Sequence, residues 1–487
     1  MPSNPLEIAG VPPLHLPALT SLVAGRPVAG DRAFDVLEKF TGQPVARVVE
    51  PTEAQIVAAV AAAQAAFDRG APPPSDRAII LRRMAELVDR NRDRFETLIV
   101  AETGFTRPDA KMEIDRSIVT LQLSAEEATR TVGEMVPFGA SPGQQDRIGF
   151  TLRLPIGIVC AITPFNSPLN TLLHKVAPAF AAGNAVIVKP SDLTPLTAAL
   201  VCETFLEAGV PPDLLTLLQG SGDTVGRRLL EAPAIAFYAF TGSTRVGRIV
   251  QQAAGLRRTQ LELGSIASTI VCADADLDRA APKIAGAAFR KAGQVCTSVQ
   301  RLHVERAVLG EVADRLVAEI RKLPAGNPWK PETRIGPMIA EEAAIRAESW
   351  VLEARAGQAR VLAGGGRTGS VMEPTLLADV RSGMRVVDEE IFAPVLSIVP
   401  FDGLAEAVAQ SNATPYGLSA GIFTRDIGAA MRASKSLRFG AVHINETSSA
   451  RGDAMPFGGV KDSGFGHEGP RYMIREVTEE RLVTINP

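Results

Sequence analysis

Four cysteines are the strongest nucleophiles in the chain, and their surroundings separate them. Cys160 and Cys272 lie in apolar stretches that we predict as strands, and Cys202 lies in a predicted helix, where a thiol usually acts as a small hydrophobic group. Cys296 lies in KAGQVCTSVQ, a polar loop predicted between a helix and a strand. We therefore regard Cys296 as the candidate nucleophile, although an idle, partly exposed cysteine fits the same pattern.

Two segments could approach a phosphate or a ribose. FTGSTRVG, residues 240–247, follows the apolar run IAFYAF and opens a helix, so its backbone N–H groups could face a phosphate. A glycine-rich turn with no ligand fits equally well. In KPSDLTP, Lys189 and Asp192 follow the predicted strand AVIVK, and ligands of open α/β sheets lie beyond the carboxyl ends of strands. A solvated lysine is the alternative.

Glu262 is a carboxylate flanked by leucines in TQLELG. If the fold encloses it, loss of solvent would raise its pKa toward that of a usable general base. A structural carboxylate held in an ion pair is the other interpretation.

The segments that must position these groups change character along the chain. Thr52 and Gln55 form a capping-box pattern that predicts a helix over 52–67. Further helices are predicted at 76–92 and up to Glu102, with Gly104 as the stop. Short alternating runs over 132–155 predict a β-hairpin.

From residue 156, β-branched runs alternate with helical stretches. The predicted strands are GIVCAI, AVIVK, LLTLL and IAFYAF, and then TIVCAD, RLHVE, PVLSIV, GLSAGIF and AVHIN. Thr194 and Pro195 are a good helix start between two of them. Segments long enough for crossover helices predict the α/β class, with two doubly wound parallel sheets in series.

Composition excludes several function classes. The 487 residues are 46% hydrophobic and 22% charged, with a formal net charge of -3, so we expect no nucleic acid partner. Prolines interrupt MPSNPLEIAGVPPLHLP at the N-terminus, and no apolar run is long enough to span a bilayer, so we expect no export signal and no membrane association. Four cysteines without a Cys-x-x-Cys pair favour a reducing, cytoplasmic location, and five scattered histidines predict no metal site.

Taken in order, these segments resemble the signatures of the aldehyde dehydrogenase superfamily, over nearly the whole chain. They are TPFNSP (163–168), KPSDLTP (189–195), FTGSTRVG (240–247), LELG (261–264), GQVC (293–296), EEIFAPV (389–395) and PFGGVKDSGFG (456–466). The resemblance implies NAD(P)-dependent oxidation of a small-molecule aldehyde to the carboxylic acid. The C-terminal segments look most like the branch with lactaldehyde and other short-chain aldehyde dehydrogenases.

The resemblance assigns catalytic roles to three residues. Cys296 would form a thiohemiacetal and then a thioester, Glu262 would activate the hydrolytic water, and Asn166 would contribute to the oxyanion hole with the Cys296 backbone N–H. Such a fixed donor is typically worth about a hundredfold to a thousandfold in rate. Hydride loss from a carbon that already carries oxygen needs the tetrahedral species that a thiolate creates.

The resemblance also implies a set of cofactor contacts. They come from Ile162, Thr163, Pro164, Phe165, Lys189, Ser191, Asp192, Gly222, Gly242, Ser243, Gly247, Leu263, Glu390 and Phe392. Asp192 is one methylene shorter than the Glu of many NAD-preferring members, but its charge would still repel a 2′-phosphate. We expect NAD as the cofactor, with NADP as the alternative.

Three residues depart from the family pattern. Lys291 replaces the Asn of N-x-G-Q-x-C, Ser265 replaces the second Gly of LELGG, and Ala393 replaces the Gly of EEIFGP. None removes a reacting group, whereas Ser265 and Ala393 add bulk where the backbone usually runs close to the cofactor.

Candidate substrate contacts come from positions around the catalytic segments. They are Arg116, Ser167, Val295, Thr297, Arg451 and Phe457. A member built for a strongly anionic aldehyde would be expected to carry His or Arg at Ser167 or Val295, and neither is cationic. Arg116 and Arg451 could still bind a carboxylate, although lone arginines commonly serve in ion pairs.

The family fold predicts how these segments are divided. Residues 1–131 and 154–262 would form the NAD(P)-binding domain and 263–440 the catalytic domain. Residues 132–153 and 468–487 would form a small β bridging element, through which we expect a homodimer or homotetramer. Two alternatives remain open: a CoA-acylating semialdehyde dehydrogenase, which would not need Glu262, and a catalytically silent cofactor-binding member, which the three departures would explain.

Overall fold

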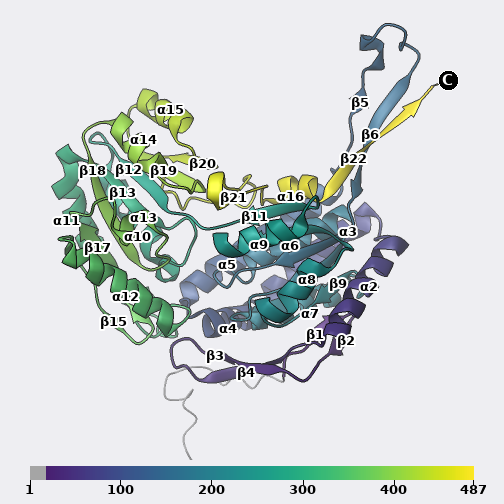
Figure 1. Ribbon diagram of the computed structural model, residues 1–487, viewed down its shortest axis with the longest axis horizontal. Coiled ribbons are helices and arrows are strands. Elements are labelled where there is room, and N and C mark those ends of the chain that lie inside the picture. Colours follow the sequence, from purple (N-terminus) through teal and green to yellow (C-terminus); the bar gives the residue numbers. More distant parts are fainter. Residues whose placement is uncertain (1–17, 487) are drawn as a thin grey trace, which may run out of the picture.

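The structure, a computed structural model, describes residues 18–486, and two sheets dominate the fold within that range (Figure 1). Residues 1–17, on which the prediction of no export signal rests, lie outside the described residues, as does residue 487 of the predicted bridging element. No helix among residues 18–486 has both the length and the apolar character that crossing a bilayer requires.

The first sheet has eight strands with a parallel centre. Their spatial order is β2 (Arg26–Val28), β1 (Ser21–Val23), β9 (Leu215–Leu217), β8 (Ala185–Lys189), β7 (Ile158–Ile162), β10 (Ile235–Thr241), β11 (Arg258–Glu262) and β21 (Gly464–Phe465). β1, β2 and β21 are antiparallel at the two edges. The winding reverses between β7 and β10, which is the switch point where open α/β sheets bind ligands.

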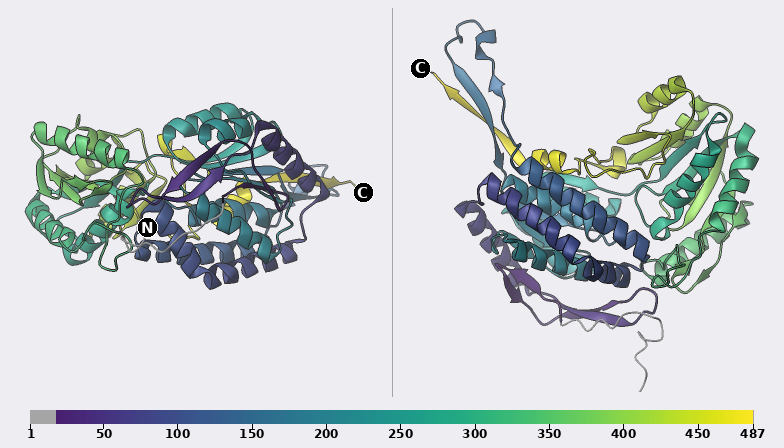
Figure 2. Two further views of the ribbon diagram at one scale, coloured as in Figure 1. Left: turned by 90° about the horizontal axis from the view of Figure 1, so that it is seen from below. Right: turned by 180° about the vertical axis from the view of Figure 1, so that it is seen from behind.

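Helices cover both faces of this sheet (Figure 2). On one face lie α2 (Glu53–Arg69), α8 (Arg227–Glu231) and α9 (Thr244–Ala254). On the other lie α6 (Asn170–Ala182) and α7 (Pro195–Ala208), backed by α3 (Pro74–Arg90), α4 (Arg92–Thr103), α5 (Arg107–Ala128) and α16 (Pro470–Glu476). The predicted capping box of Thr52 and Gln55 starts α2, and Gly104 ends α4 in the left-handed conformation, as expected.

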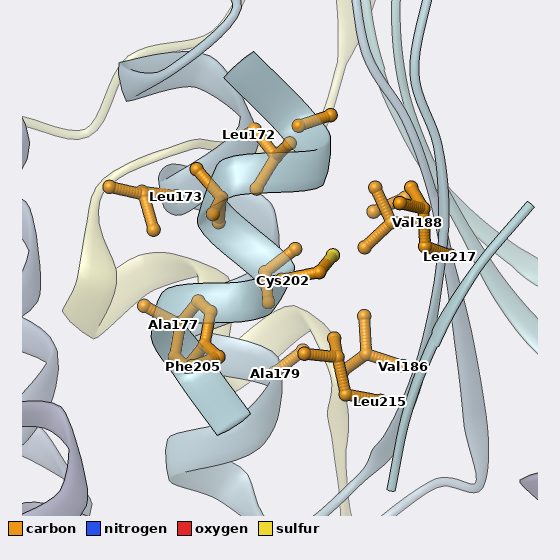
Figure 3. Packing of buried hydrophobic residues seen from close by; sticks show 14 of the residues in the cluster. Leu172, Leu173, Ala177, Ala179, Val186, Val188, Cys202, Phe205, Leu215 and Leu217 are labelled. Atoms are coloured by element: carbon orange, nitrogen blue, oxygen red, sulfur yellow. The ribbon is translucent and has the colours of Figure 1, made fainter. Parts of the chain in front are cut away.

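Figure 3 shows the apolar packing between α6, α7 and the strands β8 and β9. Cys202 of α7 lies among Val188, Leu217 and other aliphatic side chains, with its sulfur toward the sheet. Burial raises the pKa of both Cys160 and Cys202 to about 12. Both thiols are fully buried among apolar side chains and so serve as small hydrophobic groups of the core, as predicted.

The second sheet has seven strands, all parallel to their neighbours except β14. Their order is β14 (Arg360–Ala363), β17 (Thr375–Ala378), β18 (Val395–Phe401), β13 (Val299–Glu305), β12 (Ala267–Val271), β19 (Ser419–Phe423) and β20 (Ala441–Ile444). Successive strand residues face opposite sides, so Ile270 and Val271 pack in two different apolar clusters. The surrounding helices are α10 (Leu277–Phe289), α11 (Leu309–Ile320), α12 (Glu341–Ala356), α13 (Arg385–Asp388), α14 (Leu404–Asn412) and α15 (Ile427–Ser436).

A three-stranded arm projects from the body (Figure 1). β22 (Thr478–Ile485) pairs with β6 (Ile148–Pro155) along its whole length, and β5 (Met135–Val136) pairs with the other edge of β6. Two separate hairpins join β3 (Ala33–Leu37) to β4 (Pro44–Val49) and β15 (Arg367–Thr368) to β16 (Val371–Met372). Short helical turns lie at Phe138–Ala140, Gly222–Gly226, Arg290–Gly293, Arg306–Val308 and Lys461–Ser463.

The structure confirms the predicted α/β class with two parallel sheets and a small β element. The predicted domain boundaries stay a prediction; they leave 441–467 unassigned, and in that segment β20 joins the second sheet while β21 joins the first. The sequence analysis missed the strands before residue 52. The predicted helix start at Thr194 and Pro195 is confirmed, since α7 begins at Pro195, although the Thr194 side chain makes no capping hydrogen bond.

Candidate active site

The register of the first sheet brings the candidate polar residues to one edge. Lys189 of β8 lies opposite Ile162 of β7, and Ile162 lies opposite Phe240 of β10. One step further, Thr241 of β10 lies opposite Glu262 of β11. The carboxyl ends of β7, β8, β10 and β11 therefore meet at the switch point, as the topology requires.

A pocket of about 550 Å³ begins at this edge and continues to the second sheet. Its walls include the three predicted catalytic residues and every predicted substrate residue. They also include all predicted cofactor residues except Gly247. Because these groups come from segments up to 340 residues apart, only the fold could bring them together.

Cys296 lies in the loop between the turn Arg290–Gly293 and β13, and its side chain is partly exposed to the pocket. Burial raises the pKa of its thiol to about 12, and the Arg451 guanidinium opposes this by favouring the thiolate. The Cys296 backbone N–H donates no hydrogen bond among the described residues, so it is free to bind an oxyanion.

Asn166 follows β7 in the loop that faces Cys296. Its side-chain amide nitrogen, Nδ2, donates to the backbone oxygen of Gln294 at 2.8 Å. One N–H of the amide is engaged in this way, and the other has no acceptor among the described residues. Because Asn166 and Cys296 line the same pocket, this N–H is a candidate donor to an oxyanion.

Glu262 is 3% exposed, and one of its oxygens accepts from the side-chain amide of Gln260 at 3.1 Å. Its other oxygen, Oε2, is buried and has no hydrogen-bond partner among the described residues. Burial, and then the negative charge of Glu468, raise the pKa of Glu262 well above its ordinary value. A buried carboxyl with a free oxygen can accept a proton from a water molecule, and a raised pKa makes it a stronger base.

Glu468 keeps its charge although it is 1% exposed. Burial opposes its ionisation, but Lys175 and Arg451 outweigh burial and hold the pKa of Glu468 well below its usual range. The Lys175 ammonium lies 3.0 Å from one carboxylate oxygen, and Arg451 donates to the other. Glu468 is a residue that the sequence analysis missed, since nothing in its local sequence marks it.

The opposite end of the pocket offers groups suited to a dinucleotide. Lys189 is buried at the end of β8, with its ammonium donating to Pro190 at 2.9 Å, and Asp192 lies beside it in the wall. Ser243 caps the start of α9, where free backbone N–H groups suit a pyrophosphate. Glu390 accepts from the Ser265 backbone N–H at 2.8 Å, and burial raises its pKa to about 7.

The space at this end also fits such a cofactor. A Cβ added to Gly264 would lie 2.8 Å from Oε2 of Glu390. Glycine at this position therefore leaves room for the Glu390 carboxyl in the pocket lining. Gly247 has a different role, because a side chain there would collide with Leu263 at 2.4 Å. Its lack of a side chain permits α9 to pack on the sheet.

Two of the three departures from the family pattern lie away from the main pocket. Ser265 and Ala393 line a small adjoining cavity, and the Ser265 hydroxyl is buried without a partner among the described residues. The larger side chains that we expected near the cofactor therefore lie in this adjoining cavity, next to Glu390, and not in the main pocket. Lys291, the third departure, lines the main pocket.

Three arginines converge on the substrate end of the pocket. Arg116 pairs with Asp453 at 2.7 Å, and Arg451 pairs with Glu468 while its guanidinium lies 3.8 Å from the ring centre of Phe457. Both are thus ion-pair residues and pocket residues at once. The Nε–H of Arg451 is buried and has no acceptor among the described residues.

Arg290 is the arginine that the sequence analysis missed. It donates to the Ser449 hydroxyl at 2.8 Å. No carboxylate of the described residues lies within 4.0 Å of it, although the charge of Asp109 favours its ionised form. The Ser449 hydroxyl in turn lies 3.2 Å from that of Thr297, next to Cys296. The only local signal was an arginine six residues before Cys296, at the end of an apolar helix.

Ser167 lines the pocket, but its hydroxyl donates to Glu113 at 3.1 Å. Arg346 of α12 also reaches the cofactor end, and its position there could not be predicted from its neighbours in the chain. Within residues 18–486, no group of three or more His, Cys, Asp or Glu side chains is arranged to hold a metal ion.

Comparisons with known proteins agree with this geometry. The model of the aldehyde dehydrogenase family matches residues 27–483. The 3-sulfolactaldehyde dehydrogenase of Priestia aryabhattai is 42% identical over 453 residues, which cover 93% of this chain and 95% of that protein. Aspartate-semialdehyde dehydrogenase 1 of Pseudomonas canavaninivorans is 39% identical over 454 residues, with coverage of 93% and 96%.

Solved structures share the fold as well. The crystal structure of aldehyde dehydrogenase 21 from Physcomitrella patens, in complex with the reaction product succinate, superposes with a TM-score of 0.93. The two chains are 34% identical, and the match covers 96% of this chain and 98% of that one.

Proposed function

The chain belongs to the aldehyde dehydrogenase family, and from this premise we propose that it oxidises, with NAD, a short aldehyde whose far end carries an anionic group. NAD(P)-dependent aldehyde oxidation is the activity of the family. The observation that carries the finer proposal is Arg290, a pocket-lining guanidinium without a carboxylate partner among the described residues.

Cys296 is the nucleophile of the proposed reaction. The Cys296 thiol gives its proton to solvent in the pocket, a loss that the Arg451 charge favours, and the thiolate sulfur then bonds to the aldehyde carbon. The carbonyl oxygen becomes an alkoxide, held by the free N–H of the Asn166 amide and the backbone N–H of Cys296. When bound, the oxidised nicotinamide accepts hydride from this carbon, which leaves a thioester on Cys296.

Glu262 completes the reaction by hydrolysis. Its free oxygen takes a proton from a water molecule, which cleaves the thioester and releases the carboxylic acid. This role distinguishes the proposal from a CoA-acylating enzyme, in which a thiol of CoA replaces the water. The raised pKa of Glu262 supports hydrolysis, because a carboxylate with a raised pKa is a stronger base toward water.

Lys189 and Ser243 hold the adenosine ribose and the pyrophosphate in this proposal, and Glu390 holds the nicotinamide ribose. The family uses NAD or NADP. We favour NAD because the Asp192 carboxylate stands at the wall beside Lys189 and would repel a 2′-phosphate.

An anionic far end of the substrate would give two pocket groups a charged partner. Among the described residues, Arg290 has no carboxylate within 4.0 Å and donates to the neutral Ser449 hydroxyl, and the buried Nε–H of Arg451 has no acceptor. A bound carboxylate or sulfonate would form charge-assisted hydrogen bonds with both. The names of two relatives agree, since sulfolactaldehyde and aspartate semialdehyde both carry an anion, whereas the lactaldehyde and retinaldehyde of two others do not.

The remaining parts of the proposal concern organisation. We assign the first sheet to the cofactor domain, the second to the catalytic domain and the arm to a homodimer or homotetramer interface. The exposed apolar side chains of the arm support the last assignment. All four cysteines are unpaired, which supports a reducing, cytoplasmic location.

The test compares succinate semialdehyde with pentanal, two aldehydes of similar length, each with NAD and with NADP. We expect kcat/KM for the anionic aldehyde with NAD to exceed that for pentanal by at least about tenfold, because a charge-assisted hydrogen bond contributes on the order of 1.5 to 3 kcal/mol. Arg290→Met should lose most of this preference through a higher KM for succinate semialdehyde. Formation of reduced nicotinamide is the measurement.

Two controls make the result specific. Arg360→Met removes an exposed arginine paired with Asp379 and should leave both aldehydes unaffected. Cys296→Ala should abolish oxidation of both aldehydes while the cofactor still binds.

Equal kcat/KM for the two aldehydes in the parent protein would contradict the anionic substrate, and an unchanged preference in Arg290→Met would contradict the role of Arg290. A silent family member would reduce no cofactor with either aldehyde.

A further inference from the structure

The turn that precedes Cys296 has an unusual backbone. Lys291, Ala292 and Gly293 are all left-handed, with φ of 53°, 52° and 69°. This conformation suits glycine or asparagine and is disfavoured for lysine and alanine. The turn is also tightly enclosed, because a Cβ on Gly293 would lie 2.1 Å from the backbone oxygen of Ala393. Contacts of the Lys291 side chain must therefore help to hold the turn.

The Lys291 ammonium is buried and fully engaged. It lies 2.6 Å from one oxygen of Glu113 and donates to the backbone oxygen of Asn166 at 2.9 Å. It also lies 4.8 Å from the ring centre of Phe105. Glu113 belongs to α5, so the ammonium ties three segments together that are distant in the chain.

Glu113 also contacts the loop that carries Asn166. Its other oxygen accepts from the Ser167 hydroxyl and from the backbone N–H groups of Leu169 and Asn170. Burial opposes ionisation of Glu113, but the Lys291 charge and these donors hold its pKa below the usual value. The Glu113 carboxylate thus holds residues 167–170 of the loop, and the Lys291 ammonium holds the backbone oxygen of Asn166.

Asn166 is consequently held at two atoms by one turn. Its backbone oxygen accepts from the Lys291 ammonium, and its side-chain amide donates to the backbone oxygen of Gln294. The backbone N–H of Gln294 in turn donates to the backbone oxygen of Lys291 at 3.1 Å. Gln294 is separated from Cys296 by one residue. The distance between the two proposed oxyanion donors therefore depends on the same short segment.

We propose that Lys291 is a positioning residue for the oxyanion hole: its ammonium, locked on Glu113, holds the backbone of Asn166 against the turn that carries Cys296. This role rests on the functions proposed above for Asn166 and Cys296. It gives a physical reason for the lysine where many relatives have asparagine. Asparagine favours the left-handed backbone by itself, whereas lysine reaches it through a buried ion pair and adds a direct hold on the Asn166 loop.

The primary test is the rate of the first turnover in Lys291→Met, a side chain of similar length without charge. We expect the rate constant of the burst of reduced cofactor to fall by about tenfold to a hundredfold, because a small displacement of an oxyanion donor has effects of this size. Cofactor affinity, measured by calorimetry, should change by less than about twofold. Lys283→Met, in the preceding helix and paired with Glu446, is the matched control and should retain the parental rate.

A second variant separates positioning from simple charge balance. In Lys291→Met with Glu113→Gln, no buried carboxylate is left unpaired, so folding is protected. We expect the burst to remain slow, because the donor to the Asn166 backbone is still missing. Recovery of the parental burst rate in this double variant would overturn the proposal and leave Lys291 as a counter-ion only.

A double-mutant comparison with Asn166→Ala completes the test. If Lys291 acts through Asn166, adding Lys291→Met to Asn166→Ala should slow the burst by less than about threefold further. A full multiplicative loss would overturn the proposal. Parental burst rates in Lys291→Met, with an active parent protein, would refute the positioning role alone, whereas a parent that oxidises no aldehyde would refute the proposed function itself.

Discussion

At the scale of single residues, burial and the charge of Glu468 oppose the ionisation of Glu262, whereas Lys175 and Arg451 hold Glu468 ionised. The two carboxyls share one buried cluster, but Lys175 and Arg451 both contact Glu468. Among the described residues, Glu262 accepts a hydrogen bond only from the side-chain amide of Gln260. Environments of this kind push two pKa values apart and leave one carboxyl as the proton acceptor.

Glu262→Gln should therefore separate the two halves of the reaction. We expect a burst of about one reduced cofactor per active site and then a stall, because glutamine cannot take the proton of the hydrolytic water. The steady rate should fall by at least about a hundredfold. Rapid mixing with absorbance detection measures both phases, and steady turnover at the parental rate would mean that another base serves.

At the scale of elements, the start of α7 shows how a distant side chain can replace a local cap. Glu102, at the end of α4, accepts from the backbone N–H groups of Leu196 and Thr197 at 2.7 and 3.0 Å. The hydroxyl of Thr194, which we predicted as the cap, is buried without a partner among the described residues. Because α7 follows the segment from Lys189 to Thr194, this contact also supports the cofactor end of the pocket.

The stability of this cap should depend on pH. Burial raises the pKa of Glu102 to about 7, above the ordinary value of 4.5. Because the pKa is higher in the folded protein, the protonated Glu102 carboxyl favours the folded state. Its stabilising contribution is fully present below pH 4.5 and is lost as the pH rises through about 7. We expect the free energy of unfolding of the parent, relative to Glu102→Gln, to fall by about 1 to 3 kcal/mol between pH 5 and pH 8.

Urea unfolding at the two pH values measures this difference. Thr194→Val is the matched control, because its hydroxyl makes no hydrogen bond with the described residues, and it should shift the free energy of unfolding equally at both pH values. A parent and Glu102→Gln with the same pH dependence would show that Glu102 ionises normally in the folded protein.

At the scale of the whole molecule, the arm is the part least able to exist alone. It is a sheet of three strands with exposed apolar side chains at Met135, Ile148, Leu152, Leu482 and Ile485. Apolar side chains that stay exposed on such a narrow sheet favour packing against another surface. A second copy of the chain would supply that surface.

Replacing both Leu482 and Ile485 with Asp should therefore lower the molar mass in solution toward that of one chain. We expect the parent to have a mass of two or four chains, measured by light scattering after size exclusion. Leu256→Asp, at a fully exposed leucine after α9 and away from the arm, is the control and should leave the mass unchanged. An unaltered mass in the arm variant would place the interface elsewhere.

Local sequence alone determined the α/β class and two candidate catalytic residues, Cys296 and Glu262, whereas Asn166 was identified through the resemblance of successive motifs to the family. Strand and helix patterns depend on neighbours in the chain, and so do the polar loop around Cys296 and the leucines that flank Glu262. The same holds for Lys189 and Asp192, which follow a strand directly. Such features could be predicted because a few adjacent residues specify them.

The tertiary structure decided which charges meet. Lys291 pairs with Glu113, which is 178 residues away in the chain. Lys175 pairs with Glu468, which is 293 residues away. The Glu102 carboxylate, not the Thr194 side chain, caps α7, and Arg290 has no carboxylate within 4.0 Å among the described residues. None of these outcomes follows from a local pattern, because burial and Coulomb interactions depend on distances in space that chain separation does not determine.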